Sequence, residues 1–136
     1  MGSFQWPVRV YYEDTDSGGV VYYANYLKFF ERARTEMLRS KGLEQDFLRS
    51  KHNIMFAVAD VHIQYHRPAR FNDALVVVSD VVQLKKAGMS FHQVIYLQSN
   101  LETPLCTADV KIACIDEASF RPTRIPEVVL QEVKDE

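Results

Sequence analysis

The chain of 136 residues has no long apolar run, no excess of basic charge and few cysteines. None of its apolar runs approaches the ~18 residues that a membrane-spanning helix requires. A net charge of -2 provides no broad positive field, which argues against a nucleic-acid-binding protein. The length fits one domain, and 47% hydrophobic with 25% charged residues is typical of a folded globular protein.

The N-terminus lacks a basic segment followed by an apolar stretch, so we expect no secretory signal. Met1–Ser3 is interpreted as a candidate cloning remnant. The two cysteines, Cys106 and Cys114, fall in one predicted strand, where a rise of ~3.3 Å per residue holds them roughly 26 Å apart. Because a disulfide needs Cα atoms within about 7 Å, we expect two free thiols and a cytoplasmic protein.

Common catalytic and metal-binding motifs are also missing. The chain has no Gly-x-Ser-x-Gly elbow, no phosphate-binding loop and no dinucleotide fingerprint. His62 and His66 have the spacing of zinc-binding helices, but on a predicted strand they lie roughly 13 Å apart and cannot share a metal. His52 and His92 are isolated. We therefore expect neither a metal nor another cofactor.

The hydrophobic pattern predicts one strand, one long helix and then four strands, which is an α+β domain. Short connections force antiparallel pairing among the last three strands. A short helical turn is expected near Leu43–Arg49, and Gly42 is placed to end the long helix. The predicted strands are Val8–Tyr12, a segment from Met55 to His66, Leu75–Lys86, Ser90–Ser99 and Leu105–Asp116, and the predicted long helix is Tyr22–Lys41.

The long helix has one apolar face. At about 100° per residue, its large apolar side chains fall within an arc of roughly 100°. This face is expected to pack against the sheet and consists of Tyr22, Tyr26, Phe29, Phe30, Ala33 and Met37.

An acidic loop before the helix is the strongest candidate for chemistry. Glu13, Asp14 and Asp16 are followed by Gly18-Gly19, which allow a ligand to approach the backbone closely. A carboxylate beside free amides at a helix start suits acyl hydrolysis, since one group attacks or activates water and the other holds the oxyanion. Alternatively, Asp14 or Asp16 caps a helix or satisfies a turn, and the pattern alone favours this structural interpretation.

The segment Val10–Tyr26 resembles the signature of the 4-hydroxybenzoyl-CoA thioesterase branch of the hotdog superfamily. Its continuation, Phe30–Glu36, is similar to acyl-CoA thioesterases associated with the Tol-Pal cell-envelope system. The resemblance extends over Phe4–Pro126. It implies a hotdog fold, in which a curved antiparallel sheet of about five strands wraps one long central helix. It also implies edge-to-edge dimers, further assembly into tetramers and active sites between subunits.

The resemblance implies a set of site residues. It also favours the catalytic interpretation of the acidic loop over the structural one. Asp16 matches the catalytic carboxylate, and the backbone of Tyr23 matches the oxyanion amide. Some Tol-Pal-associated members have histidine where this chain has Tyr23, so no imidazole is expected there. Substrate contacts are expected at Gly19, Val20, Tyr22 and Asn25, with Arg70, Lys85 and Lys86 as candidates for the phosphates of coenzyme A.

The predicted function is hydrolysis of acyl-CoA to free acid and CoA. Asp16 acts as nucleophile or as general base on water, and the sequence leaves both routes open. Homo-oligomers and acyl carrier protein are expected partners. The alternative is a non-catalytic hotdog module that binds acyl groups and interacts with acyl carrier protein or lipid-synthesis enzymes. A hotdog dehydratase is disfavoured because no histidine lies in the acidic loop or at the helix start.

Overall fold

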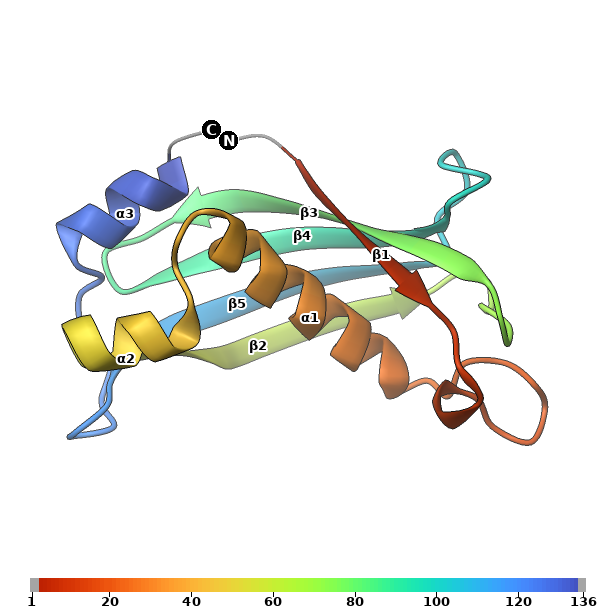
Figure 1. Ribbon diagram of the computed structural model, residues 1–136, viewed down its shortest axis with the longest axis horizontal. Helices are drawn as coiled ribbons and strands as arrows, with labels where there is room; N and C mark the ends of the chain where they lie inside the picture. The colour runs from red at the N-terminus through yellow and green to blue at the C-terminus, as the bar shows by residue number, and fades with distance from the viewer. Residues whose placement is uncertain (1–2, 135–136) are drawn as a thin grey trace.

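A computed structural model describes residues 3–134, so most of the candidate remnant Met1–Ser3 lies outside the described residues. Within these residues three helices and five strands follow one another, with one short 3-10 turn near the start (Figure 1). These elements are β1 (Phe4–Arg9), the 3-10 turn η1 (Tyr12–Asp14), α1 (Asn25–Ser40), α2 (Gln45–His52), β2 (Ile54–Tyr65), β3 (Ala74–Leu84), β4 (Gly88–Leu97), β5 (Cys106–Asp116) and α3 (Glu127–Lys134).

The five strands form one antiparallel sheet in the order β1-β3-β4-β5-β2. The predicted antiparallel pairing of the last three strands is confirmed, and α1 lies across one face of the sheet (Figure 1). This is the hotdog arrangement. β1 and β2 form the two edges of the sheet and are therefore distant from each other in sheet order, as they are in sequence.

The core lies between α1 and the sheet. On β5, alternate side chains at Ala108, Val110, Ile112 and Cys114 are buried, whereas Asp109 and Lys111 are exposed, as the period of two predicts. The helix contributes Tyr26, Phe29, Phe30, Ala33 and Met37 to the same core.

Tyr22 departs from the predicted helix face, because it lies before the helix and is 46% exposed. The helix begins at Asn25 and not at Tyr22. At the other end, Gly42 adopts a φ of +79°, its N–H bonds the carbonyl of Arg39, and the N–H of Leu43 bonds that of Leu38. The predicted glycine stop is therefore confirmed, since these two bonds satisfy carbonyls that the helix leaves open.

The first strand and the C-terminus differ from expectation. β1 ends at Arg9, and Tyr12 belongs to η1, so the predicted strand Val8–Tyr12 is wrong at its C-terminal end. Pro7 fits within β1 because this edge strand pairs with β3 alone. Helix α3 was not predicted. The helical turn expected near Leu43–Arg49 is the two-turn helix α2.

A polar network is buried beneath α1. Gln93 on β4 is fully buried, and its Nε2 donates to the carbonyl of Phe30 at 3.0 Å and to Ser79 Oγ at 2.9 Å. Arg34 Nη1 donates to Gln93 Oε1 at 3.0 Å. One amide side chain thus ties α1 to β3 and β4 and satisfies groups that burial removes from water.

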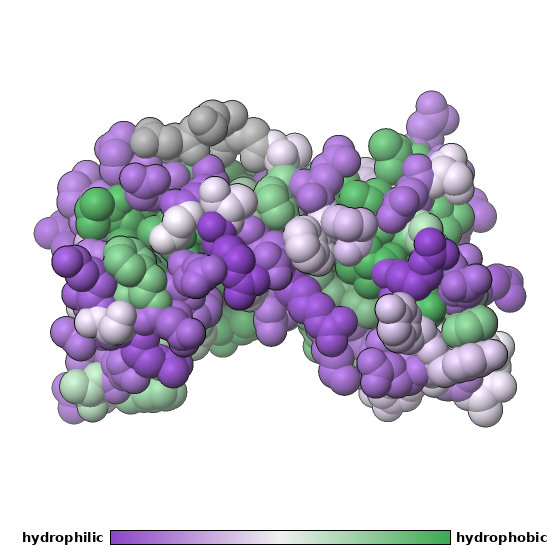
Figure 2. Space-filling view, viewed as in Figure 1, coloured by the Kyte–Doolittle hydropathy of each residue, from purple (hydrophilic) through white to green (hydrophobic). Residues whose placement is uncertain are grey.

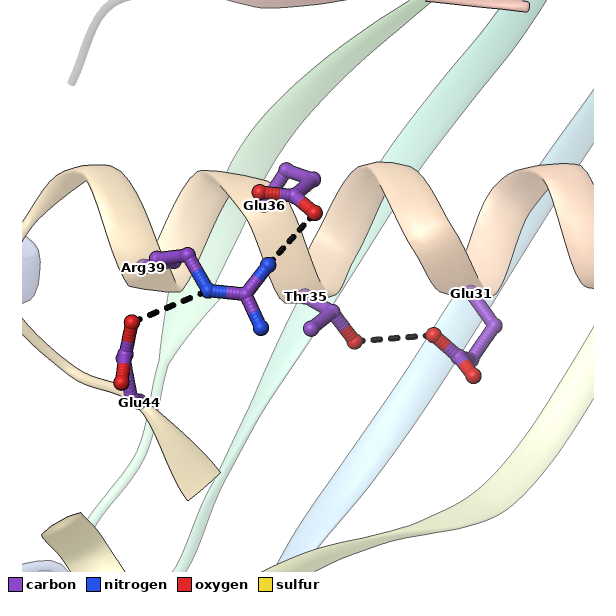
Figure 3. A network of polar contacts seen from close by, with 5 residues as sticks. All are labelled: Glu31, Thr35, Glu36, Arg39 and Glu44. Atoms are coloured by element: carbon purple, nitrogen blue, oxygen red, sulfur yellow. Dashed lines mark hydrogen bonds and ion pairs between the residues drawn. The ribbon is translucent and has the colours of Figure 1, made fainter. Parts of the chain in front are cut away.

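The opposite side of α1 is polar. Figure 2 shows hydrophilic residues across the middle of this face, with separate hydrophobic groups toward its two ends. Close by, Thr35 bonds Glu31, and Arg39 bridges Glu36 on the same helix and Glu44 ahead of α2 (Figure 3). In the described part of the chain, no helix is both long and apolar enough to cross a membrane.

Candidate active site

The acidic loop folds back on itself as a tight hairpin. The N–H of Asp16 bonds the carbonyl of Val20 at 3.0 Å, and the N–H of Gly19 bonds the carbonyl of Asp16 at 3.1 Å. Thr15 and Val21 form an isolated bridge below this turn. Gly19 has a φ of +78°, which favours glycine because a Cβ would strain that conformation. The turn therefore holds Asp16 at its tip.

The two aspartates of the loop have different surroundings. Asp14 is only 6% exposed, and its carboxylate accepts hydrogen bonds from the Tyr11 N–H at 2.9 Å and from Asn25 Nδ2 at 2.8 Å. Asp16 is exposed, and its Oδ1 accepts the Gly18 N–H at 2.8 Å. Within residues 3–134, Asp16 Oδ2 has no hydrogen-bond donor. Asp14 holds the loop in place, whereas Asp16 presents a carboxylate oxygen to solvent.

A segment between β2 and β3 is hydrogen-bonded to the C-terminal side of the acidic loop. The N–H of Val21 bonds the carbonyl of Ala69 at 2.8 Å, and the N–H of Phe71 bonds the carbonyl of Gly19 at 3.2 Å. Val20 and Arg70 form a bridge between these bonds. The structure therefore brings Arg70, which is exposed, beside the acidic loop.

The backbone ahead of α1 presents a free amide. The N–H of Tyr22 bonds the carbonyl of Asp14 at 2.9 Å, and the carbonyl of Tyr22 accepts the N–H of Asn25 at 2.8 Å. In the described part of the chain, the Tyr23 N–H between them has no acceptor. It lies at the N-terminal end of α1, where the helix dipole favours negative charge.

A pocket of about 330 Å³ is lined in part by Tyr23. Tyr26, which also lines it, is buried, and its ring meets the ring of Tyr65 edge-on at 5.5 Å. Burial raises the pKa of both phenols above their ordinary value, so both stay protonated at neutral pH. The pocket is lined by Val21, Tyr23, Tyr26, Tyr65, His66, Arg67 and Pro68.

Comparison with known proteins identifies the family. A family model described as the thioesterase-like superfamily matches residues 10–133. The chain belongs to this superfamily. It is 40% identical over 131 residues to the acyl-CoA thioester hydrolase YbgC of Escherichia coli O6:H1, with 96% of each chain covered. It is 43% identical over 126 residues to the acyl-CoA thioesterase YbgC of Haemophilus influenzae, covering 93% of this chain and 90% of that one.

A solved structure agrees with both the family and the fold. The probable thioesterase from Bartonella henselae is 36% identical and superimposes with a TM-score of 0.85, covering 92% of this chain and all of the other. The resemblance to hotdog thioesterases drawn from the acidic loop and helix start is thus confirmed.

The remaining predicted contacts of this thioesterase-like chain fall into two places. Val20 lies beside Asp16 on the hairpin and Tyr22 lies beside Asp14, but the Asn25 side chain is buried and bonded to Asp14. Lys85 and Lys86 lie at the β3–β4 hairpin, in a second pocket of about 510 Å³ that also contains Lys111. The structure therefore separates the two lysines from Arg70 within one chain.

His66 lines the same pocket as Tyr23, and its Nε2 lies 3.0 Å from Thr107 Oγ1. His92 Nδ1 lies 2.8 Å from Asp109 Oδ1 on the outer face of the sheet. Among the residues that the structure describes, no group of three or more His, Cys, Asp or Glu side chains is arranged to hold a metal. Sequence reasoning missed four consecutive residues that line the pocket, Tyr65, His66, Arg67 and Pro68, because nothing local links them to a loop more than 40 residues away.

Proposed function

We propose that this protein hydrolyses acyl-CoA thioesters to a free acid and CoA. The exposed Asp16 carboxylate, held on the same hairpin as the free Tyr23 amide, carries the proposal. Membership of the thioesterase-like superfamily supports it, as do relatives named acyl-CoA thioester hydrolase that match nearly the whole chain.

Asp16 and the Tyr23 amide have complementary roles in this proposal. The amide receives the carbonyl oxygen as it gains negative charge, and one such donor contributes about 3 kcal/mol to the transition state. In one route, Asp16 attacks the carbonyl carbon, the C–S bond breaks, CoA leaves as a thiolate, and water then hydrolyses the mixed anhydride. In the other, Asp16 takes a proton from water, which attacks the carbonyl directly.

The other predicted contacts have separate roles. Gly19, Val20 and Tyr22 contact the substrate from the hairpin, and Arg70 beside them contacts a phosphate of CoA. Asn25 acts through Asp14, since its buried amide bonds that carboxylate.

A second copy of the chain brings Lys85 and Lys86 to the site. β2 is a twelve-residue edge strand on which Val58 is 51% and Val61 38% exposed, whereas the other edge, β1, has six residues and contains Pro7. A long exposed edge strand pairs readily with another copy. Antiparallel β2–β2 pairing turns the second copy end for end, so its β3–β4 hairpin approaches the acidic loop of the first.

The length of β3 supports a site that is shared between two chains. Its eleven residues span about 33 Å, from Ala74 beside the acidic-loop end to Leu84 beside the two lysines. The proposed assembly is therefore a homodimer or a dimer of dimers with sites between subunits. We also place the protein in the cytoplasm, where reducing conditions suit free Cys106 and Cys114, and retain acyl carrier protein as a partner.

The test measures released CoA thiol with short, long and aromatic acyl-CoA substrates. We expect the wild type to turn over substrate and Asp16→Asn to lose roughly 10²–10⁴-fold in rate, which is the contribution typical of a general acid or base. Glu13→Gln changes an exposed acid of the same loop and is the matched control. Equal activity of Asp16→Asn and wild type would remove Asp16 from the mechanism. No hydrolysis of any substrate would favour the non-catalytic acyl-binding module.

Isotope labelling of the wild-type protein tests for the nucleophilic route. In a single turnover in ¹⁸O-labelled water, attack by Asp16 followed by addition of water to the Asp16 carboxyl carbon of the anhydride places label in that carboxylate and leaves the released acid unlabelled. General-base catalysis places label in the released acid alone. Mass spectrometry of the peptide containing Asp16 reads the difference.

A further inference from the structure

Tyr65, the last residue of β2, contacts the residue that carries the proposed oxyanion amide. Its Oη donates a hydrogen bond to the carbonyl of Tyr23 at 3.0 Å, although 42 positions separate the two residues. We propose that Tyr65 is a positioning residue for the Tyr23 amide, an inference that rests on the proposed function. Tyr65 does so without touching the reacting atoms.

The peptide bond on one side of the Tyr23 Cα is fixed by the helix start. The carbonyl of Tyr22 accepts the Asn25 N–H at 2.8 Å. Because a trans peptide is planar, its C=O and N–H point in opposite directions, so this bond also sets the direction of the Tyr23 N–H. The free amide therefore points away from the first turn of α1.

The peptide bond on the other side is fixed by Tyr65. The Leu27 N–H bonds the carbonyl of Ala24, which leaves the Tyr23 carbonyl outside the helical pattern. In the described residues, Tyr65 Oη is the donor that occupies this carbonyl. Both peptides that flank the Tyr23 Cα are thus held, and a donor held before the reaction stabilises an oxyanion without reorganising.

Contacts with neighbouring rings hold Tyr65 itself. Its ring meets that of Tyr26 at 5.5 Å and that of Tyr23 at 6.4 Å, both edge-on. Tyr26 is buried and its Oη accepts the Ala69 N–H at 3.0 Å, so it forms a rigid support. Tyr65 is 47% exposed at the end of an edge strand, which leaves its hydroxyl as the main link from β2 to this peptide.

The test compares Tyr65→Phe with wild type in the thioester assay. The variant keeps the ring and loses one hydrogen bond, so we expect kcat to fall about three- to tenfold with KM changed less than twofold. Tyr96→Phe, on β4 and away from the pocket, is the matched control and should keep both constants. Urea unfolding of both variants checks that the fold is retained.

A second readout separates positioning from general packing. A trifluoromethyl ketone analogue of acyl-CoA presents an oxyanion-like oxygen, whereas free CoA does not. We expect Tyr65→Phe to weaken binding of the ketone by three- to tenfold and to leave CoA binding unchanged. Equal loss for both ligands, or an unchanged kcat, would overturn the role of Tyr65.

The outcomes distinguish this inference from the proposed function. An active wild type with an unchanged Tyr65→Phe variant overturns the inference alone. A wild type that hydrolyses no thioester overturns the proposed function, and the role of Tyr65 fails with it. If activity survives in Asp16→Asn but falls in Tyr65→Phe, the Tyr23 amide stays in the mechanism and the Asp16 carboxylate is removed from it.

Discussion

Asp14 Oδ1 accepts a hydrogen bond from Asn25 Nδ2 at 2.8 Å, and this contact joins the acidic loop to the first residue of α1. Both residues are buried. A charged acceptor held in this way resists motion of the loop, because breaking the bond would leave one oxygen of a buried carboxylate without its donor. Asp14 thus positions the turn that presents Asp16.

Replacing Asn25 tests this relationship. We expect Asn25→Leu to lower the free energy of unfolding by about 1.5–3 kcal/mol, the range for hydrogen bonds to charged groups. We also expect kcat to fall, since the loop that holds Asp16 loses a fixed point. Urea denaturation and the thioester assay measure the two effects. Glu13→Gln should change neither, and a fully stable Asn25→Leu protein would contradict the role given to Asp14.

Gln93 provides a test of the buried network under α1. Gln93→Leu removes three hydrogen bonds and leaves Arg34 Nη1 without its acceptor. We expect a loss of about 2–4 kcal/mol in the free energy of unfolding, because several buried polar groups lose partners together. Chemical denaturation measures it. Gln98→Leu, which removes a single partly buried bond just beyond the C-terminal end of β4, should cost less.

Charge on the edge strand tests the proposed dimer. Val58→Asp and Val61→Asp place acids on β2, and we expect each to shift the protein toward monomer, since like charges then oppose each other across the pairing. Val82→Asp is the control, because Val82 is 58% exposed but lies on β3, which two strands separate from β2. Sedimentation velocity reads the mass. A monomeric wild type would rule out the dimer.

The two buried thiols predict how stability depends on alkaline pH. Burial raises the pKa of Cys106 to about 12 and that of Cys114 to about 11. In the unfolded chain a thiol has a pKa of about 8.5, so the unfolded state releases protons first as pH rises. Stability from these groups is complete below about pH 8.5 and is lost progressively up to about pH 11 for Cys114 and about pH 12 for Cys106.

The measurement is urea unfolding at pH 7, 8.5 and 10. A Cys106→Ala/Cys114→Ala variant should lose less stability over this range than wild type, because two of the groups that titrate in the unfolded chain are gone. Parallel losses in the two proteins would show that other groups control the alkaline range. Native thiols should also resist alkylation at pH 8, because the reactive thiolate form is suppressed.

Local patterns in the sequence determined most of the secondary structure. The period of 3.6 in the helix, the period of two on β5 and the stop at Gly42 all report on neighbours a few residues apart, and all appear in the structure. The separation of Cys106 and Cys114 along one strand follows from the same reasoning, as does the exclusion of a disulfide between them. The acidic loop was recognisable because its residues are consecutive.

Only the tertiary structure distinguished the two aspartates. Both lie in the same turn-rich segment, but the Asn25 amide and the Tyr11 N–H enclose Asp14, while Asp16 stays at the tip. Burial depends on what packs around a side chain, which local spacing does not contain. The same reason explains why Tyr22 is exposed although its spacing matched the buried face of the helix.

The contact between Tyr65 and Tyr23 was likewise decided by the order of the strands. Because β2 pairs with β5 and forms an edge, its last residue lies beside the start of α1. The sequence determined that the chain has a helix, a set of antiparallel strands and an acidic loop. Packing of the helix against the sheet decided which side chains meet there, because those contacts join residues far apart in the chain.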